Sequence, residues 1–465
     1  MAPEPDQMPT LTGKLKKYPA RTSFYWYLGI VIAGAICLRL PWCSANQRNP
    51  IGWMDALFTA TSAVCVTGLS VRSTPGDFSL IGQLVILTLI QIGGVGIMTI
   101  TSFILSQFSN GDAGLRQRLI IAETLGEKNV NLRVLVTRVL ILTVTIELLG
   151  ALLLLPSFLQ RYAWPKAAYY AVFHSISAFC NAGFALYDDS LTPFQTDWLV
   201  NLTIVGLIIA GGIGYPVLTN VIHCIGRYRL RAWDEFSMHT KIMLIGTAFL
   251  VIGGWAVFFL LERENLLRQA TPVECVLVPL FHSVSCRTAG FNTIPIDQLT
   301  EESLLVSVLL MFVGAGACST GGGVKVTTIS LLCLHAWSRF QNRTQVRIFH
   351  RTIPGRSVDR AMASTMLFLF VGSAALTTLL VVERQTDYSF VGSHVFLDFL
   401  FEVSSALGTV GLSAGLTTHL STAGRLVLVV LMFIGRLGPI SVFTALSRER
   451  REPATQYADE EPLVG

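Results

Sequence analysis

The chain has 465 residues, of which 52% are hydrophobic and only 14% are charged; 34 Lys and Arg against 29 Asp and Glu give a formal net charge of +5. Soluble proteins carry about 25% charged residues, so this composition cannot surround a core of this size with a water-facing surface. It argues against a soluble enzyme, a disordered chain and a nucleic-acid-binding protein, and the small net charge does not indicate a polyanionic partner. The composition predicts a membrane protein.

The N-terminal region and the cysteines agree with that prediction. The first 23 residues are polar and basic, and the apolar stretch behind them has no small-residue cleavage site, which predicts an uncleaved first span. The nine cysteines lie mostly in apolar stretches and show no CxxC or Cys/His spacing. We interpret them as small buried apolar residues and not as metal ligands.

Eight stretches are apolar enough, and long enough at about 20 residues, to cross a bilayer. In chain order they cover residues 24–42, 79–107, 134–156, 197–225, 241–261, 303–334, 361–382 and 424–446. Some exceed the length that a bilayer requires, which predicts tilt or a break. Between the members of each pair lies a shorter apolar segment that contains Ser, Thr, Asn and Gly.

The four shorter segments align with one another, and the alignment predicts four tandem repeats. Each has a Phe near its start, then a Ser, and then a Gly ten residues after the Phe in three copies and nine in the third. The phenylalanines are Phe58, Phe173, Phe281 and Phe401; the serines are Ser62, Ser177, Ser285 and Ser405; the glycines are Gly68, Gly183, Gly290 and Gly411.

The second span of each repeat carries a further glycine in register. It follows the loop glycine by 25, 28, 24 and 24 residues, at Gly93, Gly211, Gly314 and Gly435. The residue after this glycine is small in the first three repeats, where it is Gly94, Gly212 and Ala315. In the fourth repeat it is the charged Arg436.

These patterns divide the chain into an N-terminal segment 1–23, four repeats and a tail 448–465. The repeats cover residues 24–107, 131–226, 239–337 and 358–447. The N-terminal segment, the tail and the three linkers, counted together with Arg133, Lys241 and Arg360 at the edges of the repeats, hold 21 of the 34 Lys and Arg. Because basic residues concentrate on the cytoplasmic side, we expect both termini and all linkers to be cytoplasmic, and the shorter segments to enter from outside.

A short helix that returns through the membrane as extended backbone leaves its carbonyls unsatisfied. This is tolerated only where the backbone is buried in protein or lines water. Four such loops around a pseudo-fourfold axis form rings of carbonyl oxygens that can replace the hydration shell of a monovalent cation, and the C-terminal ends of the helices favour a cation there. The alternative for any single glycine is close helix packing, but four loops in register favour a pore.

The four loops, together with GAGACSTGGGVKVTT (314–328) and GRLGP (435–439), resemble the Trk/Ktr/HKT superfamily of potassium transporters over about residues 24–447. Only about 23 residues precede the first repeat, which makes the chain more similar to KtrB-type membrane subunits than to TrkH. The resemblance implies an all-α polytopic membrane protein with four tandem M1–P-loop–M2 repeats, which means eight transmembrane helices and four re-entrant pore helices around a pseudo-fourfold pore.

The resemblance also implies one K+ selectivity filter, in which potassium is bound by backbone carbonyls. Its residues are Val64, Cys65, Val66, Thr67 and Gly68; Phe179, Cys180, Asn181, Ala182 and Gly183; Arg287, Thr288, Ala289 and Gly290; and Gly408, Thr409, Val410 and Gly411. Plant relatives that pass sodium often carry Ser at the first of these glycines, so Gly68 favours potassium.

The glycines in the sixth span, Gly314, Gly316, Gly321, Gly322 and Gly323, cannot sustain a helix within a bilayer. A nucleotide-binding P-loop is excluded because the Gly-Lys-Ser/Thr adjacency is absent and no strand precedes this stretch. By resemblance, residues 314–323 form an intramembrane gating loop below the filter.

Two basic residues belong to this predicted gate. Lys325 either favours the closed state electrostatically or extends to the cytoplasmic face. Arg436 is expected in the pore just below the filter, where its charge limits potassium flux; the alternative is a salt bridge to a carboxylate such as Glu147.

Other polar residues in the apolar segments have structural interpretations. Glu402 and Arg287 are expected to brace the filter by hydrogen bonds or an ion pair, and His174 and His282 to make structural hydrogen bonds. Asp55 and Asp398 are predicted as helix N-caps. The sequence contains no nucleophile–base pair or metal cluster, so we do not expect an enzyme.

The resemblance further implies a homodimer with two separate pores, stimulation by sodium, and a cytosolic ring of KtrA-type nucleotide-binding regulatory subunits. Potassium is then the transported ion, sodium an activator, and no organic cofactor is expected in this chain. The arginine-rich linker 339–360 is a candidate docking surface; alternatively, the basic linkers only hold the topology and contact anionic membrane lipids. A secondary carrier with alternating access is the other functional hypothesis, disfavoured because the repeats are parallel and four in number.

Overall fold

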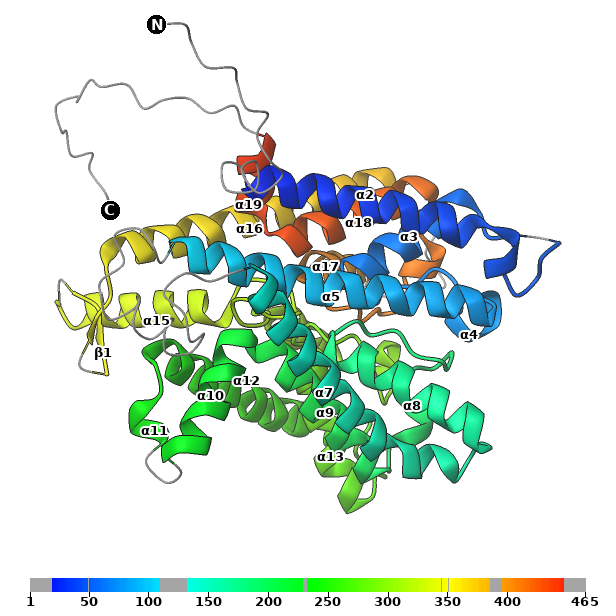
Figure 1. Ribbon diagram of the computed structural model, residues 1–465, viewed down its shortest axis with the longest axis horizontal. Helices are drawn as coiled ribbons and strands as arrows, with labels where there is room; N and C mark the ends of the chain where they lie inside the picture. Colours follow the sequence, from blue (N-terminus) through cyan, green and yellow to red (C-terminus); the bar gives the residue numbers. More distant parts are fainter. Residues whose placement is uncertain are drawn as a thin grey trace, which may run out of the picture.

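The computed structural model describes residues 19–48, 50–108, 132–228, 232–343, 345–349, 351–384 and 395–446. Within these ranges the structure is mainly helical (Figure 1). One two-stranded antiparallel sheet, β1 (Arg347–Ile348) with β2 (Arg351–Thr352), lies among them. The predicted cytoplasmic segment 1–18, most of the first linker with Arg116, Arg118 and Lys128, and the tail from 447 onward lie outside the described residues.

Five described helices are long and apolar enough to cross a membrane. They are α2 (Pro19–Arg39), α5 (Leu80–Phe108), α7 (Leu132–Leu159), α12 (Met238–Glu262) and α16 (Gly355–Val382). Apolar residues lie on all sides of these helices. This is expected of a membrane-spanning helix, because one side packs against the protein and the other contacts lipid, and both are apolar. The chain therefore passes a bilayer several times.

The three other predicted spans are broken. The first break separates α9 (Trp198–Ile213) from α10 (Tyr215–Tyr228) by a bend of 106°. The others separate α14 (Glu301–Phe312) from α15 (Val326–Phe340), and α18 (Thr422–Leu437) from α19 (Pro439–Leu446). Gly214 and Gly438, at two of these breaks, have φ of 93° and 81°, a left-handed conformation that glycine adopts readily.

A short helix covers each of the four aligned segments. These helices are α3 (Trp53–Val64), α8 (Trp164–Phe179), α13 (Pro272–Ser285) and α17 (Val395–Gly408). The phenylalanine shared by the four segments is at most 1% exposed in each copy. The remaining elements are short: η1 (Pro41–Cys43), α4 (Thr74–Asp77), η2 (Thr192–Phe194), α11 (Ala232–Glu235), η4 (Ile296–Gln298) and η5 (Thr417–His419).

The predicted N-cap roles of Asp55 and Asp398 are wrong. The N-cap of α3 is Gly52, and Asp55 lies in the first turn, where it forms ion pairs of 2.8 Å with both Arg72 and Arg425. Asp398 likewise lies inside the first turn of α17. A carboxylate in a first turn is stabilised by the positive end of the helix dipole, so an acidic residue in this region does not by itself identify the cap.

The glycines in register on the second spans bring two backbones into direct contact. A Cβ atom on Gly93, Gly211 or Gly435 would collide with the carbonyl oxygen of Val64, Phe179 or Leu407, respectively. Each of these oxygens lies in the last turn of a short helix. In three of the four segments, the end of the short helix is thus fixed against a longer neighbour, and this contact positions the loop that follows.

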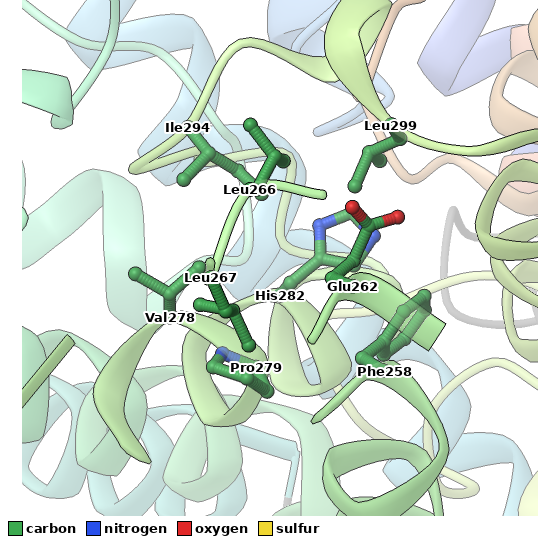
Figure 2. Close-up of a pocket in the computed structure, with 9 residues that line it drawn as sticks. All are labelled: Phe258, Glu262, Leu266, Leu267, Val278, Pro279, His282, Ile294 and Leu299. Atoms are coloured by element: carbon green, nitrogen blue, oxygen red, sulfur yellow. The ribbon is translucent and has the colours of Figure 1, made fainter. Parts of the chain in front are cut away.

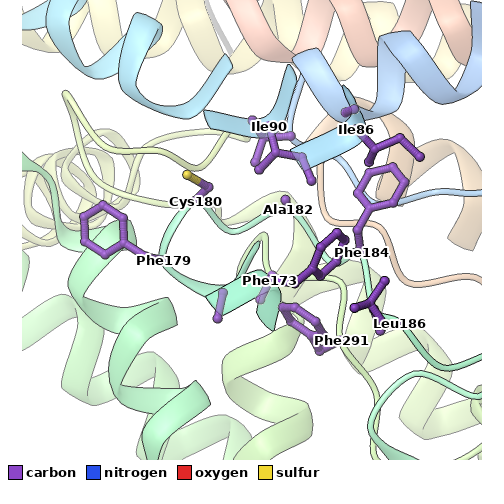
Figure 3. Packing of buried hydrophobic residues seen from close by; sticks show 14 of the residues in the cluster. Ile86, Ile90, Phe173, Phe179, Cys180, Ala182, Phe184, Leu186 and Phe291 are labelled. Atoms are coloured by element: carbon purple, nitrogen blue, oxygen red, sulfur yellow. The ribbon is translucent and has the colours of Figure 1, made fainter. Parts of the chain in front are cut away.

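The largest cluster of buried apolar residues surrounds the second of these loops. Figure 3 shows Ile86 and Ile90 of α5 close to Phe184 and Ala182, which lie at the end of the loop after α8. The loop is therefore held in a dry and closely packed surrounding.

Candidate functional site

The four loops that follow the short helices share one backbone conformation. Each loop contains two residues with left-handed φ, and the second, a glycine, follows the first by two positions. The first residues are Val66, Asn181, Thr288 and Thr409, with φ between 50° and 69°; the glycines are Gly68, Gly183, Gly290 and Gly411, with φ between 71° and 99°. Alternating backbone handedness directs successive peptide groups to one side of the chain, so each loop can present a row of carbonyls.

The four glycines form a closed ring. A Cβ atom on Gly68 would lie 3.1 Å from the Cα of Gly183, and one on Gly183 would lie 2.9 Å from the Cα of Gly290. A Cβ atom on Gly290 would lie 3.2 Å from the Cα of Gly411, and one on Gly411 would lie 3.0 Å from the Cα of Gly68. The four loops therefore follow one another in chain order around a common centre. Neighbouring glycines are too close to leave room for side chains between them.

The serine shared by the four segments anchors its loop to the short helix. The hydroxyl oxygens of Ser62 and Ser405 accept the N–H of Gly68 and Gly411, both at 3.0 Å. The hydroxyls of Ser177 and Ser285 instead donate to the carbonyls of Phe184 and Phe291, directly after the ring glycine, and the Ser177 bond measures 2.7 Å. The sequence showed that these serines repeat but not what they do. Their role appears only when the loop after the short helix folds back beside the serine.

If the first loop binds a cation, as the sequence predicts, replacing Ser62 with Ala should weaken that binding. The Gly68 N–H loses its acceptor, a change that costs about 1 kcal/mol for a half-buried group. We expect the half-saturating rubidium concentration for uptake to rise by about twofold to fivefold. Thr59→Val is the matched control, because the Thr59 hydroxyl on the same helix is buried and has no partner in the described part of the chain. Equal effects of the two variants would contradict the anchoring role.

The predicted filter residues all lie in these loops or at their edges. Val64, Phe179 and Gly408 are the last residues of α3, α8 and α17, and so belong to the helices. The remaining predicted residues follow the helix ends, and their side chains are almost completely buried. The structure thus brings together four segments that lie more than 300 residues apart at their extremes.

The glycine-rich stretch between α14 and α15 folds back on itself as an irregular loop. The N–H of Gly314 donates to the carbonyl of Val324 at 2.9 Å. The loop is also bound to α9: the N–H groups of Gly316 and Thr320 donate to the carbonyls of Gly212 and Gly211, at 2.7 and 3.2 Å. Irregular backbone in a membrane must find partners in the protein, and this loop finds them at the bend of a neighbouring span.

Arg436 joins this loop to a different span. Its side chain is buried, and Nη2 donates to the carbonyl of Gly93 on α5 at 2.6 Å, while Nη1 donates to the carbonyl of Thr320 in the loop. The alternative ion pair with Glu147 does not form: the carboxylate of Glu147 accepts from Gln91 Nε2 at 3.0 Å. A guanidinium shared between two carbonyls fixes their relative position.

Lys325 is also bound to the glycine-rich loop. Its Nζ donates to the carbonyls of Gly321 and Gly322, at 2.8 and 3.4 Å. The side chain therefore turns back onto the loop, and the expectation that it could extend to the cytoplasmic face is not met.

The buried residues beside the loops make hydrogen bonds as expected. Glu402 accepts from the hydroxyls of Thr417, at 2.6 Å, and Ser413. Arg287 donates to the Thr247 hydroxyl at 3.4 Å and forms no ion pair with Glu402.

The two histidines at matching places in the short segments, His174 and His282, also have hydrogen-bond partners. His174 contacts the carbonyl of Tyr170 at 2.8 Å, and His282 contacts the Ser307 hydroxyl at 3.0 Å. Figure 2 shows a small pocket beside His282, lined mainly by apolar side chains and Glu262. No lining residue belongs to the four loops, so the pocket is separate from the ring. The carboxylate of Glu262 already accepts from the N–H and the hydroxyl of Thr300, at 3.0 and 2.9 Å, and so does not offer a free ligand.

Comparison with known proteins identifies relatives over most of the chain. A family model described as "TrkH: Cation transport protein" matches residues 34–454. The Ktr system potassium uptake protein B of Vibrio alginolyticus is 38% identical, covering 94% of this chain and 93% of that protein. The protein of the same name from Bacillus subtilis is 37% identical, covering 94% of each. The potassium/sodium uptake protein NtpJ of Enterococcus hirae is 35% identical, covering 94% of this chain and 95% of that protein.

A solved structure shows the same fold. The crystal structure of the potassium transporter TrkH from Vibrio parahaemolyticus matches with a TM-score of 0.72 and 20% sequence identity, covering 92% of this chain and 85% of that chain.

Proposed function

The chain belongs to the TrkH family of cation transport proteins, and from this premise we propose that it is a potassium uptake transporter of the Ktr/Trk type. It is a multi-pass membrane protein, and its relatives are ion transport proteins and not enzymes. The observation that supports the proposal most strongly is the closed ring of Gly68, Gly183, Gly290 and Gly411. The names of the relatives include potassium, and a ring of backbone carbonyls is suited to binding a dehydrated potassium ion.

In the proposed mechanism, potassium passes through the ring in a dehydrated form. The carbonyls of the predicted filter residues replace its hydration shell. The short helices end at the loops, so their negative C-terminal ends favour a cation there. A negative cell interior drives the ion inward, with about 2.3 kcal/mol per charge for each 100 mV.

We place the gate at the loop of residues 314–323, with Lys325 and Arg436 as the residues that hold it. The hydrogen bonds of the loop to α9, and those of Arg436 to Thr320 and Gly93, support this assignment. The positive charge of Arg436 next to the ion path would limit the passage of potassium.

The larger assembly is part of the same proposal. It comprises four repeats with the boundaries given above, cytoplasmic termini, a homodimer, stimulation by sodium, and a cytosolic ring of KtrA-type regulators. The word "system" in the names of two relatives supports further subunits, and the potassium/sodium name of a third supports a role for sodium.

Rubidium uptake into vesicles that contain the purified chain tests the proposed function. We expect uptake down an imposed gradient, competition by external potassium, and stimulation by sodium. A complete lack of potassium-competed uptake, with and without sodium, would disprove the proposal. A strict requirement for a sodium or proton gradient would instead favour the secondary carrier.

A further inference from the structure

Three of the four loops carry a polar side chain at the same position, two residues before the ring glycine. These residues are Asn181, Thr288 and Thr409, and Val66 takes this position in the first loop. All are fully buried. The amide of Asn181 and the hydroxyl of Thr288 are hydrogen-bonded at 3.3 Å, whereas the Thr409 hydroxyl has no partner in the described part of the chain.

The glycine-rich loop is packed directly against two of these side chains. A Cβ atom on Gly321 would collide with the hydroxyl of Thr288, and a Cβ atom on Gly322 would collide with the hydroxyl of Thr409. Gly322 also lies close to the end of α17, since its Cβ atom would be 3.0 Å from the carbonyl oxygen of Gly408. The two glycines are therefore required by close approach, apart from any need for flexibility.

The same loop is also bound to α8 and α18. The Thr320 hydroxyl donates to the carbonyl of Phe179, the last residue of α8, at 3.2 Å. The carbonyl of Thr320 accepts from Arg436. One residue thus binds two surrounding elements while the next two residues lie against Thr288 and Thr409.

We propose that Thr288 and Thr409 form a seat for the glycine-rich loop, and that Gly321 and Gly322 let the loop close onto it. This inference rests on the proposed function, because it treats the loop as the gate. The contact is one of shape: the unpartnered hydroxyl of Thr409 is covered by a residue that has no side chain. Opening then requires the loop to leave the seat, and any added volume at this contact favours the open arrangement.

The rate at which Cys318 is alkylated reports how often the glycine-rich loop leaves the seat. Cys318 lies in the same loop and is 8% exposed, so a loop that leaves its seat should expose it. The full-length protein in detergent is treated with a small thiol reagent, and the modified cysteine is identified by mass spectrometry. No ion gradient is involved, so the result does not depend on transport.

We expect Gly322→Ala to raise the rate of Cys318 alkylation by about tenfold, because overpacking a tight contact is strongly unfavourable. Thr409→Ala alone removes volume from the seat and should raise the rate by only about twofold to threefold. In the double variant the hydroxyl that causes the most severe collision is gone and only milder contacts, including that with the Gly408 carbonyl, remain, so the rate should fall most of the way back to that of Thr409→Ala. Gly206→Ala is the matched control, since a Cβ atom there meets nothing within 4 Å.

A double variant that is alkylated as fast as Gly322→Ala would overturn the seat, as would a Gly322→Ala variant with the wild-type rate. If Gly322→Ala does not fold, Thr409→Ala decides alone, and an unchanged rate argues against the contact. Potassium-competed rubidium uptake by the wild-type protein is measured in parallel. Its absence would refute the proposed function, and the alkylation pattern would still show whether the seat exists.

Discussion

Replacing Arg436 with Gln is expected to raise rubidium flux through the purified protein, without any regulator, by about tenfold to a hundredfold. The guanidinium makes two charge-assisted hydrogen bonds, to the carbonyls of Gly93 and Thr320. Both bonds are buried, where such interactions are strongest. Their loss frees the glycine-rich loop and also removes a fixed positive charge from the proposed ion path.

The Arg436→Lys variant separates these two effects. Lysine keeps the charge but has no planar fork to bind two carbonyls at once. A flux close to that of Arg436→Gln would assign the effect to the hydrogen bonds, and a flux close to wild type would assign it to the charge. If Arg436→Gln itself conducts no faster than the wild-type protein, Arg436 does not restrain the gate.

Replacing Gly68 with Ser is expected to lower the preference for potassium over sodium by about tenfold. The Cβ atom would lie 2.5 Å from the carbonyl oxygen of Ala182 and 3.1 Å from the Cα of Gly183. The second loop must therefore move, and the carbonyl ring loses its regular arrangement. The φ of 99° at Gly68 adds strain for any residue with a side chain.

Gly415→Ser is the matched control for Gly68→Ser. Gly415 has a φ of 96°, but a Cβ atom there meets nothing within 4 Å. Both variants thus carry similar backbone strain, and only one disturbs the ring. Competition of sodium and potassium against rubidium uptake measures the selectivity. Unchanged selectivity in Gly68→Ser, or an equal loss in Gly415→Ser, would show that the ring glycine is not a selectivity determinant.

The sequence predicted the parts of this site that repeat along the chain. The short segments and the second-span glycines were found because four copies show the same spacing, and Arg436 was noticed because three copies have a small residue in its place. Structure supplied what spacing cannot: that a ring glycine contacts its neighbour, and that the Arg436 side chain binds Thr320 and Gly93.

Other features depend on contacts between distant residues. Asp55 pairs with Arg425, 370 positions later, and a single sequence gives no sign of this pair, so a local role as N-cap was assigned instead. The sequence predicted tilt or a break in the longest spans but did not place the sharp bend at Gly214, and here the reason is different. Its cause is local, but the apolar pattern continues through it, and hydropathy alone cannot distinguish a straight span from a sharply bent one.

The ring of four glycines is completed by a single polypeptide. A cell that produces both wild-type and variant chains would therefore contain rings that are entirely of one kind or the other. A defective ring glycine cannot poison a ring made from wild-type sequence, as it would in a pore assembled from four separate copies. Genetically, the loss of functional rings should scale with gene dosage, and a mutation can change the sequence of one loop without making the same change in the other three.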